Sequence, residues 1–383
     1  MPNQIALNAL FLHYPFSGTG RYLYHLIQGA AASRDLILLG SAAFPPDLAL
    51  GDLVTRQLTT PFDGRSRSLA KVWFEQIALP RAARRNRARL AHVPYFAAPL
   101  RPLLPSCVTV HDLVPVIRPE YRRTAAQRLY SALVIRGLAS VDRIVTDSVA
   151  SAHDLTTRLG ISGARIRVIP LGVDPRFRPL ETDAERAWAS AVLARQRLDG
   201  PYFLYVGGLD RRKNVDGLVR AFARLRRERR VSQGLAIVGA LRPGDALFYD
   251  PRPDVERLGI SDSVRLLGQV GDDEVRALQA RADVFVFPSL YEGFGLPPLE
   301  AMACGAPVVC SAASSLPEVV GDAGLLFDPG SEDALVGALG SLVDDVELRR
   351  HLGRKGRERA TGFTWEKTVA STVSVWDEVV TGH

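Results

Sequence analysis

Apolar runs of strand length alternate along this chain with longer amphipathic segments. The runs fall into two sets: Gln4–Leu10, Asp35–Leu39, Cys107–His111, Arg143–Thr146 and Arg167–Pro170, then Tyr202–Val206, Leu235–Val238, Val264–Leu266, Val284–Phe287 and Val308–Cys310. Runs of Val, Ile and Leu without polar alternation are typical of parallel strands that helices cover on both faces. We therefore predict an α/β protein in which a β-α-β rhythm occurs twice.

The two sets of strands are separated by a Pro- and Gly-rich segment, Pro170–Pro179, and a charged helix, Glu181–Leu198, follows it. A chain of 383 residues also exceeds one ordinary core. We predict an N-terminal domain at residues 1–175 and a C-terminal domain at 176–362. Open parallel sheets bind ligands at the carboxyl ends of their strands, so function is expected on the post-strand loops, with a ligand shared across a cleft between the sheets.

The last segment, residues 363–383, is predicted to be a closing helix. Its apolar side chains Trp365, Val369, Val373 and Trp376 share one helical face. No apolar stretch approaches the roughly 20 residues that a membrane-spanning helix needs. The apolar start, Ile5–Leu12, favours a buried strand over a signal peptide, so we expect a cytoplasmic protein without a transmembrane segment.

The sharpest motif is Tyr291–Glu300, with the letters YEGFGLPPLE, which follows a predicted strand and opens a helix. The carboxylates of Glu292 and Glu300 bracket a turn whose glycines permit close approach of a ligand. Free amides at the helix start can bind sugar hydroxyls or phosphate oxygens. For an isolated pair of glutamates, a helix cap and a solvated side chain are the simpler interpretation, but the glycines and prolines favour a binding site.

This motif resembles the E-x7-E signature of family 4 retaining glycosyltransferases, which have the GT-B fold. The resemblance continues through Ala301–Val309 and Leu316–Gly324 and covers nearly the whole chain, most closely over residues 200–330. It implies two Rossmann-like parallel-sheet domains facing a central cleft, an acceptor-binding N-terminal domain, and a C-terminal helix that closes back toward it. It also implies that Glu292 faces the transferred sugar and that Glu300 holds the ribose hydroxyls. Further donor contacts are implied for Gly293, Phe294, Gly295 and Leu296.

A second motif, Tyr205–Asn214, places Gly207 and Gly208 at a strand end and a run of cations directly after them. A departing diphosphate develops negative charge, which Arg neutralises by bidentate contact and Lys as a point charge. A basic surface turn is the alternative. The resemblance assigns this role to Lys213. The arginine that many relatives carry is replaced by Gly208 in this chain, so we assign its role to Arg212 instead.

A glycine loop with Gly18, Thr19 and Gly20 follows the first predicted strand. Leu23 stands where a dinucleotide fingerprint has its third glycine, and no acid after Asp35–Leu39 could hold a ribose, so a dehydrogenase is not expected. The resemblance implies that this loop closes over the donor phosphates and sugar. A plain β-α turn is the alternative.

The segment Val108–Leu113 places His111 at the end of a strand. A lone histidine is more often structural than catalytic, but the resemblance implies that His111 contacts the donor sugar. We expect Asp112 to orient the ring or the backbone. Ser148, after the next strand, is expected to cap a helix.

The chain lacks the residues of a familiar metal site. No two Asp residues are separated by one residue, so the D-x-D metal clamp of the other common glycosyltransferase fold is absent. Cys107, Cys304 and Cys310 form no C-x-x-C pair and have no His at zinc spacing, so we expect buried thiols. We therefore predict neither a metal nor a cofactor, with cations in the place of the metal.

The net charge of +7 is uneven, because residues 1–180 hold 23 Lys and Arg against 11 Asp and Glu, and the rest hold 25 against 30. A basic half attracts phosphate-bearing acceptors, anionic lipid or nucleic acid, but no nucleic-acid module is present and a solvated arginine-rich surface is an equal alternative. The segment Ala70–Ile77 is one candidate for peripheral contact with anionic membrane or a lipid-linked acceptor. A core-facing helix is favoured there, with solvated arginines at Arg81, Arg84, Arg85, Arg87 and Arg89.

Together with the resemblance, these observations predict a metal-independent glycosyltransferase that uses a nucleotide-sugar donor and a glycan or lipid-linked acceptor in cell-surface polysaccharide synthesis. The resemblance implies that the enzyme retains the anomeric configuration. The predicted catalytic residues are His111, Arg212, Lys213 and Glu292. Resemblance to bacterial polysaccharide mannosyltransferases favours GDP-mannose as the donor over UDP- or ADP-glucose. The alternatives are a GT-B nucleotide-sugar epimerase and a non-catalytic nucleotide-sugar-binding protein.

Overall fold

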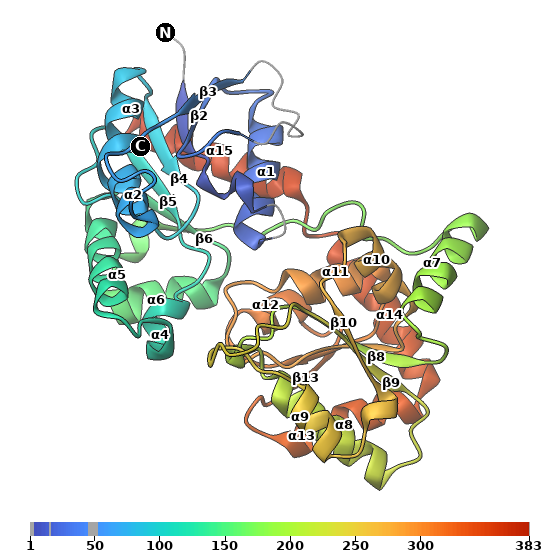
Figure 1. Cartoon of the computed structure of the whole chain (residues 1–383). Coiled ribbons are helices and arrows are strands. Elements are labelled where there is room, and N and C mark those ends of the chain that lie inside the picture. The colour runs from blue at the N-terminus through green and yellow to red at the C-terminus, as the bar shows by residue number, and fades with distance from the viewer. Residues whose placement is uncertain (1–3, 15–16, 45–52, 383) are drawn as a thin grey trace. The chain divides into compact units, whose positions relative to one another are not determined.

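The computed structural model describes residues 4–14, 17–44 and 53–382 (Figure 1). The chain forms two compact units, one made of the residues up to Gly172 and those from Thr364 onward, the other of Val173–Phe363. Each unit is built on a parallel sheet with helices packed against it (Figure 1). The predicted α/β class and its repeated β-α-β rhythm are therefore confirmed.

The sheet of the first unit has, within the described residues, seven strands in the order β3-β2-β1-β4-β5-β6-β7. All neighbouring strands pair in parallel. The strands are β1 (Ile5–Asn8), β2 (Leu36–Gly40), β3 (Val54–Gln57), β4 (Leu90–Val93), β5 (Ser106–Thr109), β6 (Arg143–Thr146) and β7 (Ile166–Val168). The order reverses between β1 and β4, so the loops that follow these two strands diverge at this point, which is where such sheets bind ligands.

The sheet of the second unit has six described strands in the order β10-β9-β8-β11-β12-β13, again all parallel. The strands are β8 (Tyr202–Val206), β9 (Gly234–Val238), β10 (Val264–Gly268), β11 (Val284–Phe287), β12 (Val308–Ser311) and β13 (Leu325–Phe327). Here the order reverses between β8 and β11, the strands that precede the two sharpest sequence motifs.

Helices connect the strands in both units. In the first unit they are α1 (Gly18–Ala30), α2 (Arg67–Trp73), the π-helical turn η2 (Phe74–Ala78), α3 (Leu79–Arg85), α4 (Val114–Ile117), α5 (Ala125–Gly137), α6 (Val149–Leu159) and α15 (Trp365–Thr381). In the second unit they are α7 (Asp183–Arg195), α8 (Val215–Glu228), α9 (Arg252–Arg257), α10 (Asp272–Arg281), α11 (Leu296–Cys304), α12 (Leu316–Val320), α13 (Glu332–Asp344) and α14 (Val346–Ala360). Short 3-10 turns link several of them.

The sequence pattern predicts none of β3, β4 and β13. β3 is mostly exposed at one edge of its sheet, so its sequence lacks the run of apolar residues that predicts a buried strand. β4 is buried but follows an arginine-rich segment directly, and β13 has only three residues. The first predicted strand, Gln4–Leu10, is also too long, because the chain turns into a 3-10 helix at Leu10.

The last helix, α15, packs within the first unit, as the predicted closing helix requires. Thr364 caps its N-terminus, and its side chains Trp365, Val369 and Trp376 are buried. The indole Nε1–H of Trp376 donates to Nδ1 of the buried His92 at 3.0 Å. Because the indole buries a large apolar surface and its one donor is satisfied, this contact fixes the tail against β4.

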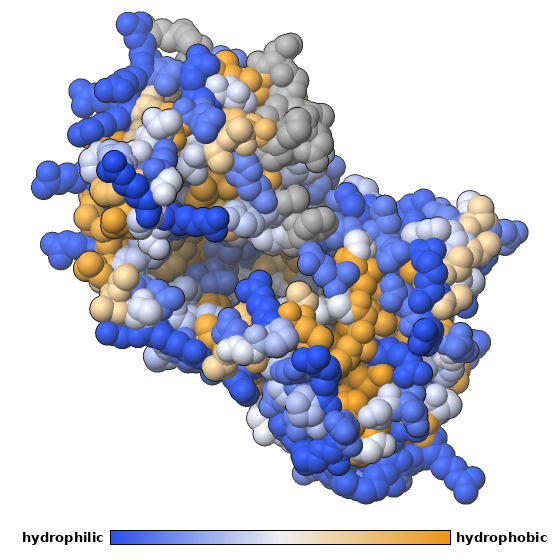
Figure 2. Space-filling model, viewed as in Figure 1, coloured by the Kyte–Doolittle hydropathy of each residue, from blue (hydrophilic) through white to orange (hydrophobic). Residues whose placement is uncertain are grey.

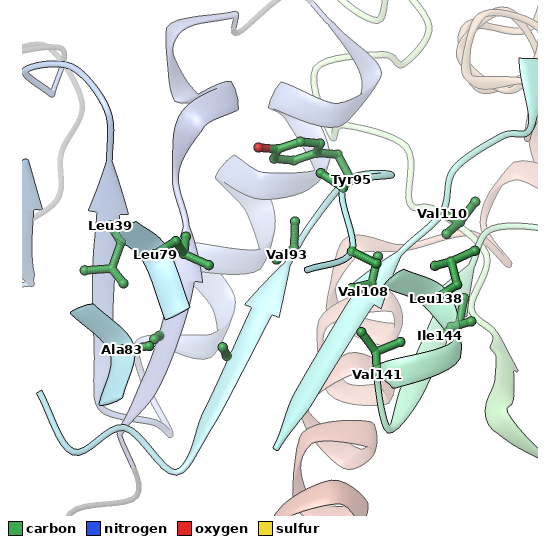
Figure 3. Close-up of a cluster of buried hydrophobic side chains, with 14 of the residues drawn as sticks. Leu39, Leu79, Ala83, Val93, Tyr95, Val108, Val110, Leu138, Val141 and Ile144 are labelled. Atoms are coloured by element: carbon green, nitrogen blue, oxygen red, sulfur yellow. The ribbon is translucent and has the colours of Figure 1, made fainter. Parts of the chain in front are cut away.

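One core cluster of the first unit gathers aliphatic side chains from β4, β5, β6, α3 and the segment after α5, among them Val93, Val108 and Ile144 (Figure 3). Tyr95 closes this core beyond the carboxyl end of β4 (Figure 3). Cys107, Cys304 and Cys310 are free and buried, as predicted. Buried thiols of this kind pack as small hydrophobic side chains, and the Cys304 thiol also donates to Gln279 Oε1 at 3.6 Å.

The basic segment after Ala70 has one core-facing side. Phe74, Leu79 and Ala83 are buried, and the five arginines between Arg81 and Arg89 are exposed. The favoured interpretation, a core-facing helix with solvated arginines, is confirmed. Hydrophilic side chains cover much of the visible face of each unit (Figure 2). Among the described residues, no helix has the length and apolar character to cross a bilayer.

Candidate functional site

The loop after β8 turns sharply and places its cations beside the end of β11. Gly207 and Gly208 follow the strand, and the Tyr205 hydroxyl donates to the Gly208 carbonyl at 2.6 Å. Arg211–Lys213 then form one 3-10 turn, which Asn214 ends in the left-handed conformation at φ 54°. Asparagine tolerates this backbone better than most residues, so the chain turns into α8 directly after Arg212 and Lys213.

The loop after β11 is held by side chains from the next loop along the sheet. The Ser314 hydroxyl accepts from the Glu292 amide at 2.8 Å and donates to its carbonyl at 2.9 Å. The buried Ser315 hydroxyl donates to the carbonyl of Phe294 at 2.6 Å. Gly295 has φ 133°, which L side chains rarely adopt, and an added Cβ would lie 2.9 Å from Leu316. Glycine here lets α11 begin immediately, with proline in its first turn as predicted.

Arg212, Lys213 and Glu292 meet at the reversal point of the sheet. The Lys213 ammonium donates to Glu292 Oε1 at 2.6 Å, and Arg212 Nη1 donates to Oε2 at 2.9 Å. Arg212 Nη1 also donates to the Tyr291 carbonyl at 2.9 Å, and its Nε lies 3.0 Å from an Asp210 carboxylate oxygen. Two neighbouring cations and a carboxylate that lies 79 and 80 positions further along the chain therefore form one ionic cluster, in which Lys213 and Glu292 are buried and Arg212 is partly buried.

Burial and charge act on this cluster in opposite directions. Burial favours the neutral form of Glu292, but the charges of Lys213 and Arg212 outweigh it and lower the pKa of Glu292 to about 2. Burial, together with the neighbouring Arg212 charge, lowers the pKa of Lys213, which the carboxylate of Glu292 opposes. Glu292 is therefore a permanent carboxylate near neutral pH.

The other predicted donor residues of this unit lie on the same two loops. Gly293, Phe294 and Gly295 join Glu292 to α11, and Leu296 is its first residue. Glu300 lies one turn further along α11 and is only 4% exposed, so it is not a solvated side chain. Phe294 is also buried, with its ring 6.0 Å from that of Phe363.

His111 belongs to the first unit and follows β5. Its Nδ1 pairs with Asp147 Oδ2 at 2.7 Å, and its Nε2 lies 3.1 Å from the Pro94 carbonyl. Of the two roles expected for Asp112, the structure shows the second: its carboxylate accepts from the Val114 backbone amide at 3.0 Å, and Asp147 rather than Asp112 pairs with the ring. Asp147 takes that position because it follows β6, the strand beside β5.

Burial alone would lower the pKa of His111, but the charge and hydrogen bond of Asp147 outweigh it and raise the pKa. The edge of the Tyr22 ring also packs against the imidazole, with ring centroids 5.0 Å apart. Ser148, next in the chain after Asp147, caps α6 by accepting from the Ser151 amide, as predicted. His111 is thus held from both nitrogens in a mostly enclosed position.

Gly18, Thr19 and Gly20 form the first turn of α1, with Ser17 as the N-cap. The Ser17 hydroxyl accepts from the Gly20 amide at 3.0 Å. A Cβ on Gly20 would lie 2.1 Å from the Tyr14 carbonyl oxygen, so glycine permits a close backbone crossing here. The predicted glycine loop is therefore a helix start, whose amides are of the kind that bind anions.

Sequence reasoning missed four side chains that hold these sites, namely Asp147, Asp210, Ser314 and Ser315. Asp147 and Asp210 stand inside segments already of interest, directly after β6 and directly before the cations. Their partners were not predictable, since they follow from strand order. Across residues 4–14, 17–44 and 53–382, no group of three or more His, Cys, Asp or Glu side chains is placed to hold a metal ion.

Comparisons with known proteins identify the family of this chain. A family model described as glycosyl transferases group 1 matches residues 194–359, and one described as Glycosyltransferase Family 4 matches residues 16–177. The O-antigen chain mannosyltransferase B of Escherichia coli is 32% identical over 380 residues, covering 95% of this chain and 97% of the relative. The MMP alpha-(1->4)-mannosyltransferase of Mycolicibacterium hassiacum is 36% identical over 292 residues, covering 72% and 66%.

Among solved structures, a sucrose-phosphate synthase from Thermosynechococcus elongatus matches the whole of both chains with a TM-score of 0.77 at 24% identity. This match shows the same fold, two parallel-sheet α/β units in the GT-B arrangement of elements. Together with the two family models and the near full-length relative, it shows that the chain belongs to the group 1, family 4 glycosyltransferases.

Proposed function

We propose that this protein is a retaining, metal-independent mannosyltransferase that uses GDP-mannose and transfers mannose to a glycan or lipid-linked acceptor in cell-surface polysaccharide synthesis. One observation carries the proposal: Arg212 and Lys213 converge on the carboxylate of Glu292 at the point where the strand order reverses. The mannosyltransferase names of two relatives support the choice of sugar.

The cations are suited to a diphosphate leaving group. A diphosphate carries more negative charge than one carboxylate, so it competes with Glu292 for Arg212 and Lys213. The charge that develops on the leaving group in the transition state strengthens these contacts, which is what accelerates the reaction. No metal ion is needed in this scheme, because the buried Lys213, the partly buried Arg212 and the amides at the start of α11 supply the positive potential.

The carboxylates are suited to the neutral parts of the donor. Glu292, a carboxylate held next to both cations, is assigned to hydroxyls of the transferred sugar. Glu300 is assigned to the ribose hydroxyls, since a buried carboxylate accepts well from a vicinal diol. Gly207, Gly208, Gly293, Phe294, Gly295 and Leu296 are assigned to the surrounding donor contacts.

The first unit is assigned to the acceptor and to further contacts with the donor. His111, oriented by Asp147, is assigned to a sugar hydroxyl, and the first turn of α1 with Gly18, Thr19 and Gly20 to the donor phosphates. Because no side chain stands out as a covalent nucleophile, we assign retention to attack on the front face of the donor, with the leaving diphosphate accepting the acceptor proton.

The donor is tested by thermal shift with GDP, UDP and ADP, followed by transfer assays with the matching sugars. Stabilisation by GDP and transfer of mannose are expected. Stabilisation by UDP without GDP would exclude the donor assignment. Transfer that continues in the presence of a chelator supports metal independence, and the anomeric configuration of the new bond, read by NMR, tests retention.

The same assay separates the alternatives. An epimerase would interconvert nucleotide-sugars without an acceptor, and a binding protein would bind GDP but neither hydrolyse nor transfer the donor. Loss of transfer in Lys213→Ala with GDP binding only weakened favours the transferase.

A further inference from the structure

The first unit contains a buried glutamate, Glu75, to which the proposed function assigns no role. Glu75 is 1% exposed, and its carboxylate accepts from three side chains. The Lys71 ammonium lies 2.6 Å from Oε1, the Tyr95 hydroxyl donates to Oε1 at 2.8 Å, and the Tyr130 hydroxyl donates to Oε2 at 2.9 Å. We call Lys71, Glu75, Tyr95 and Tyr130 the Glu75 cluster.

The cluster lies at the reversal point of the first sheet. Asn8 is the last residue of β1, Tyr95 follows β4, and the Asn8 side-chain amide donates to the Tyr95 hydroxyl at 2.9 Å. Tyr95 stands past the end of the β4 arrow (Figure 3). This is the position in the first unit that corresponds to the Arg212, Lys213 and Glu292 cluster in the second, and it is where open parallel sheets bind ligands.

Two further features set this cluster apart from ordinary core packing. Glu75 sits on η2, a π-helical turn between α2 and α3, and such turns are rare and frequent at functional sites. Pro94, the neighbour of Tyr95 in the chain, offers its carbonyl to His111 Nε2 at 3.1 Å. The cluster is therefore joined through two adjacent residues to the histidine assigned to the donor sugar.

The charges of the cluster are balanced internally. Two tyrosine hydroxyls hold the Glu75 carboxylate beside Lys71, so the carboxylate cannot turn away and release the ammonium to an anion. The Lys71 ammonium also lies 4.3 Å from the centroid of the Tyr130 ring and donates to the Tyr130 hydroxyl. A single compensated cation is a poor phosphate site.

The groups that stay available match an alcohol. The ammonium has three donors, of which Glu75 and Tyr130 take two, and 37% of the Lys71 side chain is exposed. The Tyr130 oxygen, which donates to Glu75 and accepts from Lys71, keeps a second lone pair. One donor beside one acceptor suits a hydroxyl, which both accepts and donates, whereas a phosphate dianion only accepts.

We propose that the Glu75 cluster is the acceptor subsite and that it selects a neutral sugar hydroxyl rather than a phosphate group. Lys71 and Tyr130 contact the acceptor hydroxyl, the Tyr130 ring packs against the apolar face of the sugar, and Glu75 and Tyr95 are positioning residues. This inference rests on the proposed function only in treating the first unit as the acceptor unit.

The test measures binding of methyl α-mannoside and of an α-linked mannobiose to the full chain by saturation-transfer NMR. Tyr130→Phe removes one hydroxyl and Lys71→Met removes the ammonium while keeping most of the length of the side chain. Each is expected to weaken sugar binding about tenfold, the effect of one lost hydrogen bond that involves a charged group. The Kd for GDP, from calorimetry, is expected to change less than about twofold, because its contacts lie in the second unit.

Tyr202→Phe is the matched control, because it removes a buried tyrosine hydroxyl that donates to the Leu278 carbonyl at 2.7 Å in the second unit. It should leave sugar binding unchanged. Three results would overturn the proposal: neither sugar binds the wild type, the variants weaken GDP as much as sugar, or inorganic phosphate competes with the sugars and loses its binding in Lys71→Met. Since sugar binding is measured without a donor, a failure of GDP-mannose to bind would count against the proposed function alone.

Discussion

The two sheets of this protein reverse their strand order in the same way, but the side chains gathered at the two reversal points differ. In the second unit, the carboxylate of Glu292 accepts from two cations that lie on the neighbouring loop. In the first unit, the carboxylate of Glu75 accepts from one cation and two tyrosine hydroxyls. One backbone arrangement thus carries two chemistries, one suited to an anionic leaving group and one to a neutral alcohol.

The difference shows what the fold contributes and what it leaves to side chains. A parallel sheet brings the loops after two central strands together at its carboxyl edge whatever their sequence. Glycines follow β8 and β11, where the proposed function assigns donor contacts, whereas in the first unit the rings of Phe11 and Tyr95 pack together beyond β1 and β4. The side chains at each sheet edge therefore decide which ligand it suits, because the two edges have the same fold.

The strongest test of the comparison is Lys213→Ala. Removing this ammonium takes away charge stabilisation of the leaving diphosphate, and we expect kcat to fall about 1,000-fold, the size seen when one such group is lost. Steady-state transfer from GDP-mannose is the measurement. Lys355→Ala is the control, since Lys355 pairs with Asp322 at the surface and that pair contributes little. Equal activity of the two variants would contradict the role of Lys213.

The next largest effect is on stability, in Glu292→Gln. The pKa of Glu292 is about 2 in the folded state, below the ordinary 4.5 of the unfolded chain. The Glu292 carboxylate therefore stabilises the fold above pH 4.5, and this stabilisation is lost as the pH falls toward 2. The loss amounts to about 3 kcal/mol between pH ~5 and ~2. In Glu292→Gln this pH dependence should disappear, and the unpaired cations should cost about 3 kcal/mol near pH 7. Urea denaturation across pH measures both, and an unchanged pH slope would refute the ionic cluster.

A smaller effect is expected in Asp147→Asn. Asp147 raises the pKa of His111, so the imidazolium form stabilises the fold below the unfolded value of 6.5 and this contribution is lost as pH rises through the folded pKa. Without the carboxylate, the pKa of His111 should fall, and kcat/KM should drop about tenfold, as for one charged hydrogen bond. NMR titration of the His111 ring and pH-rate profiles measure these changes. Asp112→Asn serves as the comparison, because the Asp112 charge also raises the pKa of His111 but its carboxylate bonds to the Val114 amide, so a smaller fall in that pKa is expected.

The smallest effect concerns the closing helix, in Trp376→Phe. The phenyl ring keeps most of the buried surface but leaves His92 Nδ1 without its donor, which should lower the free energy of unfolding by about 1 kcal/mol. Thermal and urea unfolding measure this change in the free energy of unfolding. Because this contact supports the first unit only, the Kd for GDP should stay the same, and a change in that constant would mean that the two sites are coupled.

Much of the fold was predictable because its signals are local. Uniform apolar runs such as Tyr202–Val206 and Val284–Phe287 mark buried parallel strands, and both have the predicted bounds. The exposed edge strand β3 and the three-residue β13 were not predictable, since their pairing is stabilised by neighbours in the sheet rather than by their own composition.

The sequence by itself determined the class of fold, the family through its E-x7-E motif, and the two loops on which Lys213 and Glu292 lie. Only the tertiary structure decided which partners meet: Arg212 with a carboxylate 80 residues away, Asp147 rather than Asp112 with His111, and Glu75 with Tyr130, 55 residues further along. The physical reason is that the secondary structure of a segment depends mainly on residues close to it in the sequence. The partners of a buried charge depend instead on which strands and loops the fold places side by side. A buried carboxylate must find its donors wherever the sheet places them.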